Sequence, residues 1–198
     1  MVVVIVVASV VVVVAFPHTG TPVKIAPAPQ PTFTFLSASD LTSIYGYAIT
    51  ATNYTKNLSS ALPSGISTQG LAKAQMWIYQ PFQTSPIMNS SSIMVVGILI
   101  MEMNSSSVVN ASFRSFEHSM ENESGVTTTT GNLSVFRYVS ASGTVNSVPL
   151  TLYWAVYDQY ILFMEFYGKT TTQESTVFSH QVSSMRPPVP SPSQVPGP

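Results

Sequence analysis

The chain has 198 residues and no cysteine. This absence excludes disulfide bonds, zinc–thiolate sites and a thiol nucleophile, so the core alone must hold the fold. Charged residues are scarce as well: they make up 8% of the chain, against roughly 25% in typical soluble domains. Because the formal net charge is −1, we expect neither a nucleic acid nor an anionic lipid surface as a partner.

Residues that commonly carry catalysis are few. Asp40 and Asp158 are the only aspartates, and the three histidines, His18, His118 and His180, are not spaced as metal ligands. The sequence has no Gly-x-Ser-x-Gly motif and no phosphate-binding glycine loop. We therefore predict that the protein is not an enzyme, with no catalytic residues, no metal ligands and no cofactor.

One acidic cluster with a histidine occurs near the end of a predicted helix, at Glu117, His118, Glu121 and Glu123. Such a group could hold a cation. A solvated helix face is the preferred interpretation, because charged residues at helical spacing usually face water.

Serine and threonine replace the missing charges and make up about a quarter of the chain. Seven of the eight asparagines begin an Asn-x-Ser/Thr glycosylation acceptor, where chance would give about two. The seven are Asn53, Asn57, Asn89, Asn104, Asn110, Asn122 and Asn132. We predict that all are exposed and carry N-linked glycans, since a glycan cannot be buried. Together with the missing disulfides, they indicate an exported cell-surface glycoprotein of archaeal type.

Residues 1–16, MVVVIVVASVVVVVAF, form an apolar run that is shorter than the ~20 residues of a membrane-spanning helix. The run fits a signal peptide cleaved after Ala15, although no Lys or Arg precedes it. An uncleaved membrane anchor is the second interpretation. A third is a retained strand that pairs with a neighbouring subunit, because valine favours strands.

A proline-rich segment lies on each side of the region that is expected to fold. Residues 17–36 hold five prolines and are predicted to be an extended spacer. Residues 187–198 form a second Pro-rich segment, a tail predicted to be disordered. One α+β sandwich domain is therefore expected over residues 37–186.

Hydrophobic periodicity within this domain predicts six strands and two longer helices. The strands are expected at 47–55, 72–80, 93–103, 133–140, 148–157 and 160–167, and the helices at 106–122 and 172–185. A short helix should begin near Asp40. Asp158-Gln159 predicts a hairpin turn. The expected architecture is a mostly antiparallel sheet with both longer helices packed on one face.

The sequence also contains a short internal repeat: ILIMEM at 98–103 recurs as ILFMEF at 161–166. Each run precedes a Ser/Thr-rich loop and a helix. We interpret this as a possible duplication of a β-β-β-α unit, with coincidence among apolar strands as the alternative.

In this order of elements the domain resembles the PsbP-like and LpqN-like exported α/β sandwich domains. The resemblance covers residues 40–185 and includes no diagnostic motif, so it implies no roles for individual residues. It implies an accessory or surface protein without enzyme activity.

Strand alternation also predicts an aromatic, sparsely charged interaction face opposite the helices. Its residues would be Trp77, Tyr79, Glu102, Tyr153, Tyr157 and Glu165. Alternatively, Glu102 and Glu165 sit at strand ends near water and pair with Lys or Arg.

Two functions are consistent with these features. The first is a structural or adhesive surface protein that self-associates or binds another surface protein, and that could assemble into a coat or filament. Its apolar face would require a cover. The second is an extracytoplasmic binding module for a small ligand or a membrane-complex partner. In both, the protein contacts the membrane only through residues 1–16, if they are uncleaved.

Overall fold

The computed structural model describes residues 34–55, 70–82, 93–168 and 172–185. The predicted signal or anchor at 1–16, most of the spacer and the tail at 187–198 lie outside these ranges. Within them, no helix is both long and apolar enough to cross a membrane.

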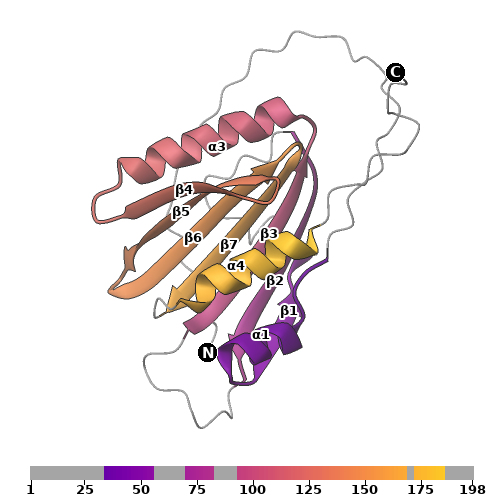
Figure 1. The fold of residues 1–198 in the computed structure, drawn as a ribbon, viewed down its shortest axis with the longest axis vertical. Helices are drawn as coiled ribbons and strands as arrows, with labels where there is room; N and C mark the ends of the chain where they lie inside the picture. The colour runs from indigo at the N-terminus through magenta and orange to yellow at the C-terminus, as the bar shows by residue number, and fades with distance from the viewer. Residues whose placement is uncertain (1–33, 56–69, 83–92, 169–171, 186–198) are drawn as a thin grey trace, which may run out of the picture.

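The domain is built on one antiparallel sheet of seven strands, in the order β1-β2-β3-β7-β6-β5-β4 (Figure 1). The strands are β1 (Ile49–Asn53), β2 (Leu71–Pro81), β3 (Ile93–Met103), β4 (Thr127–Leu133), β5 (Phe136–Val145), β6 (Val148–Tyr157) and β7 (Tyr160–Gly168). The helices are α1 (Ala38–Tyr45), α3 (Ser106–Glu121) and α4 (Gln173–Ser184).

The predicted α+β class and antiparallel sheet are confirmed. The described residues form seven strands instead of about six, and three helices including the short one. The strand that the prediction missed is β4, Thr-Thr-Thr-Thr-Gly-Asn-Leu. A run of threonines with a glycine resembles a loop, and only its ladder with β5 makes it a strand. The predicted strand at 133–140 therefore combined the end of β4 with the start of β5.

The prediction that both longer helices pack on one face is wrong. Phe113 and Phe116 of α3 pack with Leu99 and Met101 of β3. Phe178 of α4 packs with residues of the opposite parity, such as Ile98. Since successive side chains of a strand point to opposite faces, α3 covers one face while α4 and α1 cover the other. In Figure 1, α4 crosses in front of the strands.

Burial on both faces explains why the central strands read as continuous apolar runs. β3 and β7 pair with each other in the middle of the sheet, and neighbouring residues that point to opposite faces are both buried, such as Ile98 and Leu99. Strands at the margin, such as β4, alternate between half-buried and exposed residues instead.

Helix α3 is held by one apolar stripe and a cap. The Ser105 side chain accepts a hydrogen bond from the backbone N–H of Val108 at the start of the helix. Phe116 stacks on Trp154 of β6 with 4.7 Å between the ring centroids. The Arg137 guanidinium lies 4.2 Å from the centroid of the Phe113 ring. This helix therefore attaches to the β5–β6 side of the sheet.

Helices α1 and α4 are connected to the sheet through a buried polar side chain, Gln181, which is 0% exposed. Its Oε1 accepts from the backbone N–H of Leu36 at 3.1 Å, and its Nε2 donates to the carbonyl of Thr34 at 3.0 Å. Tyr79 donates from its hydroxyl to the Leu36 carbonyl at 2.6 Å. Leu36, placed in the spacer by the sequence prediction, therefore belongs to the core.

The proposed duplication is not confirmed. If the two halves were related by a two-fold axis, that axis would exchange the antiparallel neighbours β3 and β7 and would run perpendicular to the sheet. Such a rotation keeps each side chain on its own face of the sheet, so both helices would have to lie on the same face. The helices that follow these two strands nevertheless lie on opposite faces. Likewise, Ile98 and Ile161 occupy the same position in the two copies of the repeated sequence but point to opposite faces.

Candidate functional site

Glu165 is the most unusual side chain in the sheet. It lies on β7, the central strand, between Gly97 of β3 and Leu152 of β6. Its carboxyl shares the α3 face with Phe163 and Tyr167, two residues away on either side. The side chain is only 9% exposed. A carboxyl therefore occupies a position where an apolar side chain is expected.

The carboxyl of Glu165 makes no hydrogen bond or ion pair within the part of the chain that the structure describes. Burial raises its pKa from 4.5 to about 7, because the charged form loses its hydration. The side chain thus changes charge near neutral pH and can donate or accept a hydrogen bond. A perturbed, unpartnered carboxyl in a fold is a common mark of a functional position.

Gly97 lies directly across the ladder from Glu165. A Cβ added to Gly97 would meet the Glu165 Cβ at 3.8 Å, an ordinary van der Waals contact, and no other described atom within 4 Å. Glycine within a central strand often marks a place where another group approaches the backbone closely. A methyl group at Gly97 would therefore fit beside Glu165 without displacing a described atom.

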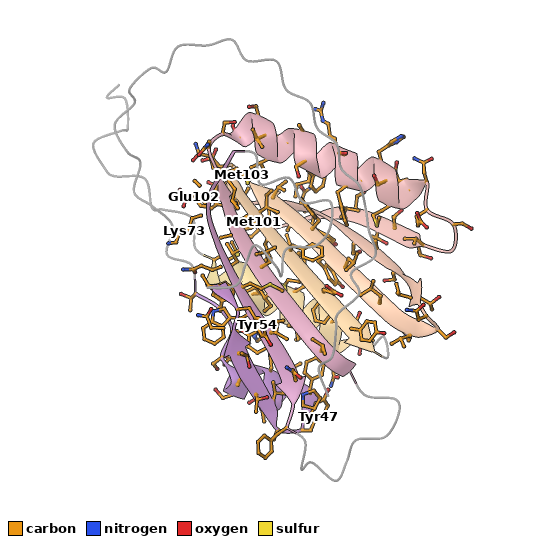
Figure 2. The ribbon with its side chains drawn as sticks, turned by 180° about the vertical axis from the view of Figure 1, so that it is seen from behind. Tyr47, Tyr54, Lys73, Met101, Glu102 and Met103 are labelled. Atoms are coloured by element: carbon orange, nitrogen blue, oxygen red, sulfur yellow. The ribbon has the colours of Figure 1, made fainter. Side chains whose placement is uncertain are left out.

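Glu102 occupies a different place from the one predicted. It lies near the end of β3, opposite Lys73 of β2, and the alternation of β3 puts it on the face away from Glu165. Figure 2 shows Lys73 and Glu102 near each other at the same end of the sheet. Burial, and secondarily the Glu102 carboxylate, raises the pKa of Tyr160 to about 12. The strand-end alternative therefore suits Glu102 but not Glu165.

The predicted interaction face does not exist as one surface. Trp77, Tyr79 and Tyr153 belong to the core beneath α1 and α4. Tyr79 is 1% exposed, and Tyr153 stacks on Phe178 of α4 at 4.4 Å. Tyr157 packs on Phe136 in the same cluster, whereas Glu165 is on the opposite side. Among the described residues, the large apolar side chains that remain exposed are Phe82 and Val135.

A second polar group is buried under α4. Glu174, in the first turn of that helix, is 3% exposed and contributes to raising the pKa of Tyr45 and of Tyr153. Desolvation is the larger cause in both and brings the pKa of Tyr153 to about 12. The Tyr45 hydroxyl in this core is buried without a hydrogen-bond partner among the described residues. Sequence reasoning missed this cluster, since Glu174 resembles an ordinary helix-start carboxylate.

The glycosylation acceptors lie where modification requires them. Five fall within the described residues and all five are exposed: Asn53, Asn104, Asn110, Asn122 and Asn132. Asn57 and Asn89 lie outside those residues. Asn104 precedes α3, Asn110 lies on it and Asn122 ends it. The five described acceptors therefore lie on or beside α3 and on strands β1 and β4.

No group of three or more His, Asp or Glu side chains within the described ranges is arranged to hold a metal ion. His118 and Asn122 instead interact at the end of α3, where the Asn122 Nδ2 donates to the His118 carbonyl at 2.6 Å. The acidic residues near them are thus part of a helix end without a metal-binding geometry.

No protein-family model matches the chain, and comparison with curated proteins finds no relative by sequence. The fold is similar to the crystal structure of the extracellular domain of PknH from Mycobacterium tuberculosis. The TM-score is 0.52 at 11% sequence identity, over 76% of this chain and 92% of that one. The likeness is one of fold. At this identity it transfers no residue roles.

Proposed function

We propose that this protein is an exported, N-glycosylated binding module without enzyme activity, and that Glu165 is the polar contact for its ligand. The observation that carries the proposal is the buried carboxyl on the central strand, which has no partner among the residues that the structure describes.

The extracytoplasmic location is supported by two independent features. Acceptors far in excess of chance are exposed wherever the structure describes them. The fold is also similar to a domain described as extracellular.

Binding is favoured over adhesive self-assembly because the argument for assembly needed a broad uncovered apolar face. Of the residues expected there, Tyr79 is buried in the domain's own core, and Trp77 and Tyr153 pack against that core. No such face therefore needs a partner to cover it. A coat or filament would have to depend on another surface.

Glu165 supports a binding role because burying its carboxyl lowers the stability of the fold. A buried carboxyl without a partner destabilises a protein by several kcal/mol unless it is neutral, and an apolar residue would remove that cost. Positions that break the rules of stability in this way are frequently functional. The apolar neighbours Phe163, Tyr167 and Leu152 would contact the body of a ligand, and the carboxyl would orient an amine or hydroxyl group.

The experiment has two parts. Mass spectrometry of the protein isolated from its native source, under denaturing and then native conditions, measures the glycan mass and any retained small molecule. Thermal shift with benzylamine, and with benzyl alcohol as its neutral isostere, then tests the site at pH 8. We expect stabilisation by the amine that Glu165→Gln abolishes and the matched control Glu102→Gln keeps.

Equal responses of wild type and Glu165→Gln to both probes, with no retained molecule, would contradict the binding role. An absence of glycan on the native protein would contradict the proposed extracytoplasmic location, independently of the binding role.

A further inference from the structure

We propose that N-glycans on Asn53 and Asn132 shield the two edge strands of the sheet from pairing with other chains. The inference rests on the proposed glycosylation and adds a role for two of its sites.

Both outermost strands carry an acceptor. β1 and β4 terminate the sheet order at its two ends, so each has one side that pairs with no described strand. Asn53 is the last residue of β1, and Asn132 lies one residue before the end of β4. Both side chains are exposed. A bulky, solvated glycan would thus leave the sheet at each of its open margins.

Neither edge strand carries in its own sequence the charges or prolines that blunt many natural edges. Natural edges are blunted by lysine, proline, bulges or inward-pointing charges. β1 reads ITATN and β4 reads TTTTGNL, so neither carries a charge or a proline. Their ladders run without a register shift, at five pairs for β1 with β2 and seven for β4 with β5. An uncharged, β-branched, regular edge is a template for another strand.

Both acceptors lie on paired strands, and the Asn53 side chain is also fixed by a hydrogen bond. The Asn53 Oδ1 accepts from the Thr55 backbone N–H at 2.8 Å, which leaves the Nδ2 that would carry the sugar directed away from this bond. Asn132 lies across the ladder from Arg137, whose Nη2 donates to the Asn110 Oδ1 at 3.1 Å. Each glycan therefore begins from an ordered backbone at the margin.

The remaining acceptors supply a matched control. Asn110 and Asn122 are exposed but belong to α3, which is not an edge of the sheet. Removing these two glycans subtracts the same amount of sugar as removing those on Asn53 and Asn132. A general loss of solubility would affect both pairs of variants equally, whereas edge protection would affect only one pair.

The test uses full-length protein secreted from an N-glycosylating host, with occupancy at each asparagine determined by peptide mass spectrometry. The variants are Asn53→Gln/Asn132→Gln and Asn110→Gln/Asn122→Gln. Light scattering after size exclusion, and thioflavin fluorescence during incubation at high concentration, report strand pairing. We expect at least a five-fold larger aggregated fraction for the edge pair, while the control pair stays as monomeric as wild type.

A rescue variant separates edge pairing from poor folding. Thr52→Lys and Thr129→Lys place a charge at an exposed position of each edge strand. Added to the edge pair, they should restore the monomer, because lysine blunts edges as the glycan does. Aggregation that is equal in both pairs, or that the lysines leave unchanged, would overturn the inference.

Glycan occupancy at each asparagine distinguishes failure of the edge-shielding role from failure of the proposed function. Glycans on the other acceptors but none on Asn53 and Asn132 would overturn the edge role alone. Absence of glycan on all seven in the native protein would remove its premise, together with the glycoprotein part of the proposed function.

Discussion

Replacing Glu165 by glutamine should change how the stability of the protein depends on pH. Burial raises the pKa of this carboxyl to about 7 in the folded protein, against 4.5 as its ordinary value in the unfolded chain. Between these two values the folded state holds a proton that the unfolded state has lost, so stability falls as pH rises. The loss is complete once pH exceeds the folded pKa of about 7.

The size of the effect follows from the difference in pKa. Each pKa unit corresponds to 1.36 kcal/mol, so a difference of about 2.5 units corresponds to ~3 kcal/mol between pH 4 and pH 8. Glutamine has nearly the shape of the protonated acid and does not titrate. Glu165→Gln should therefore match wild type at pH 4 and exceed it by ~3 kcal/mol at pH 8, or by roughly 6–12 °C in melting temperature.

Urea unfolding of both proteins at several pH values measures this difference directly. Glu102→Gln is the control, and it should keep the wild-type decline because Glu165 is still present. A stability difference between Glu165→Gln and wild type that is constant across pH would refute the reasoning, since it would show that the carboxyl does not titrate differently in the two states.

Three further predictions test the core and its attachments. Trp154→Ala should lower the free energy of unfolding by ~3–5 kcal/mol, because the indole stacks on Phe116 at 4.7 Å and is buried; a loss below ~1 kcal/mol in a denaturant melt would show that the side chain is poorly packed. Gln181→Leu should cost ~1–3 kcal/mol, since the Leu36 N–H loses its partner and the Thr34 carbonyl keeps only the hydrogen bond from the Ser184 hydroxyl. Faster hydrogen exchange at Leu36 should accompany that loss, and unchanged exchange would contradict it. Gly131→Ala should destabilise the β4–β5 ladder, because a Cβ would lie 2.9 Å from the Tyr138 hydroxyl. Thermal unfolding of this variant beside Gly97→Ala, whose Cβ would make an ordinary contact with the Glu165 Cβ at 3.8 Å, separates the clash from the loss of a strand glycine.

Much of the secondary structure was predictable because the central elements carry strong local signals. β3 and β6 begin and end where the apolar runs predict, and β7 extends one residue further. α3 was evident from the stripe of Val109, Phe113, Phe116 and Met120. β4 was missed because its threonines carry no such signal, and pairing with β5 decided its conformation.

The candidate site was only half predictable. The sequence singled out Glu165, since a carboxylate in an apolar strand breaks the pattern. It could not tell Glu165 from Glu102, which stands in an almost identical run. The difference in their surroundings comes from position: Glu102 lies near a strand end opposite Lys73, and Glu165 lies mid-strand opposite Gly97.

The sequence by itself determined the apolar elements, the acceptor sites and which residues of one strand share a face, because these depend on neighbours within a few positions. Only the tertiary structure decided which face each strand presents to which helix. A shift of one residue in the pairing of two strands moves every side chain to the other side, and nothing local to either strand records that register. For this reason α3 and α4 lie on opposite faces, the expected aromatic surface is core, and Glu165 is separated from Glu102 by the sheet itself.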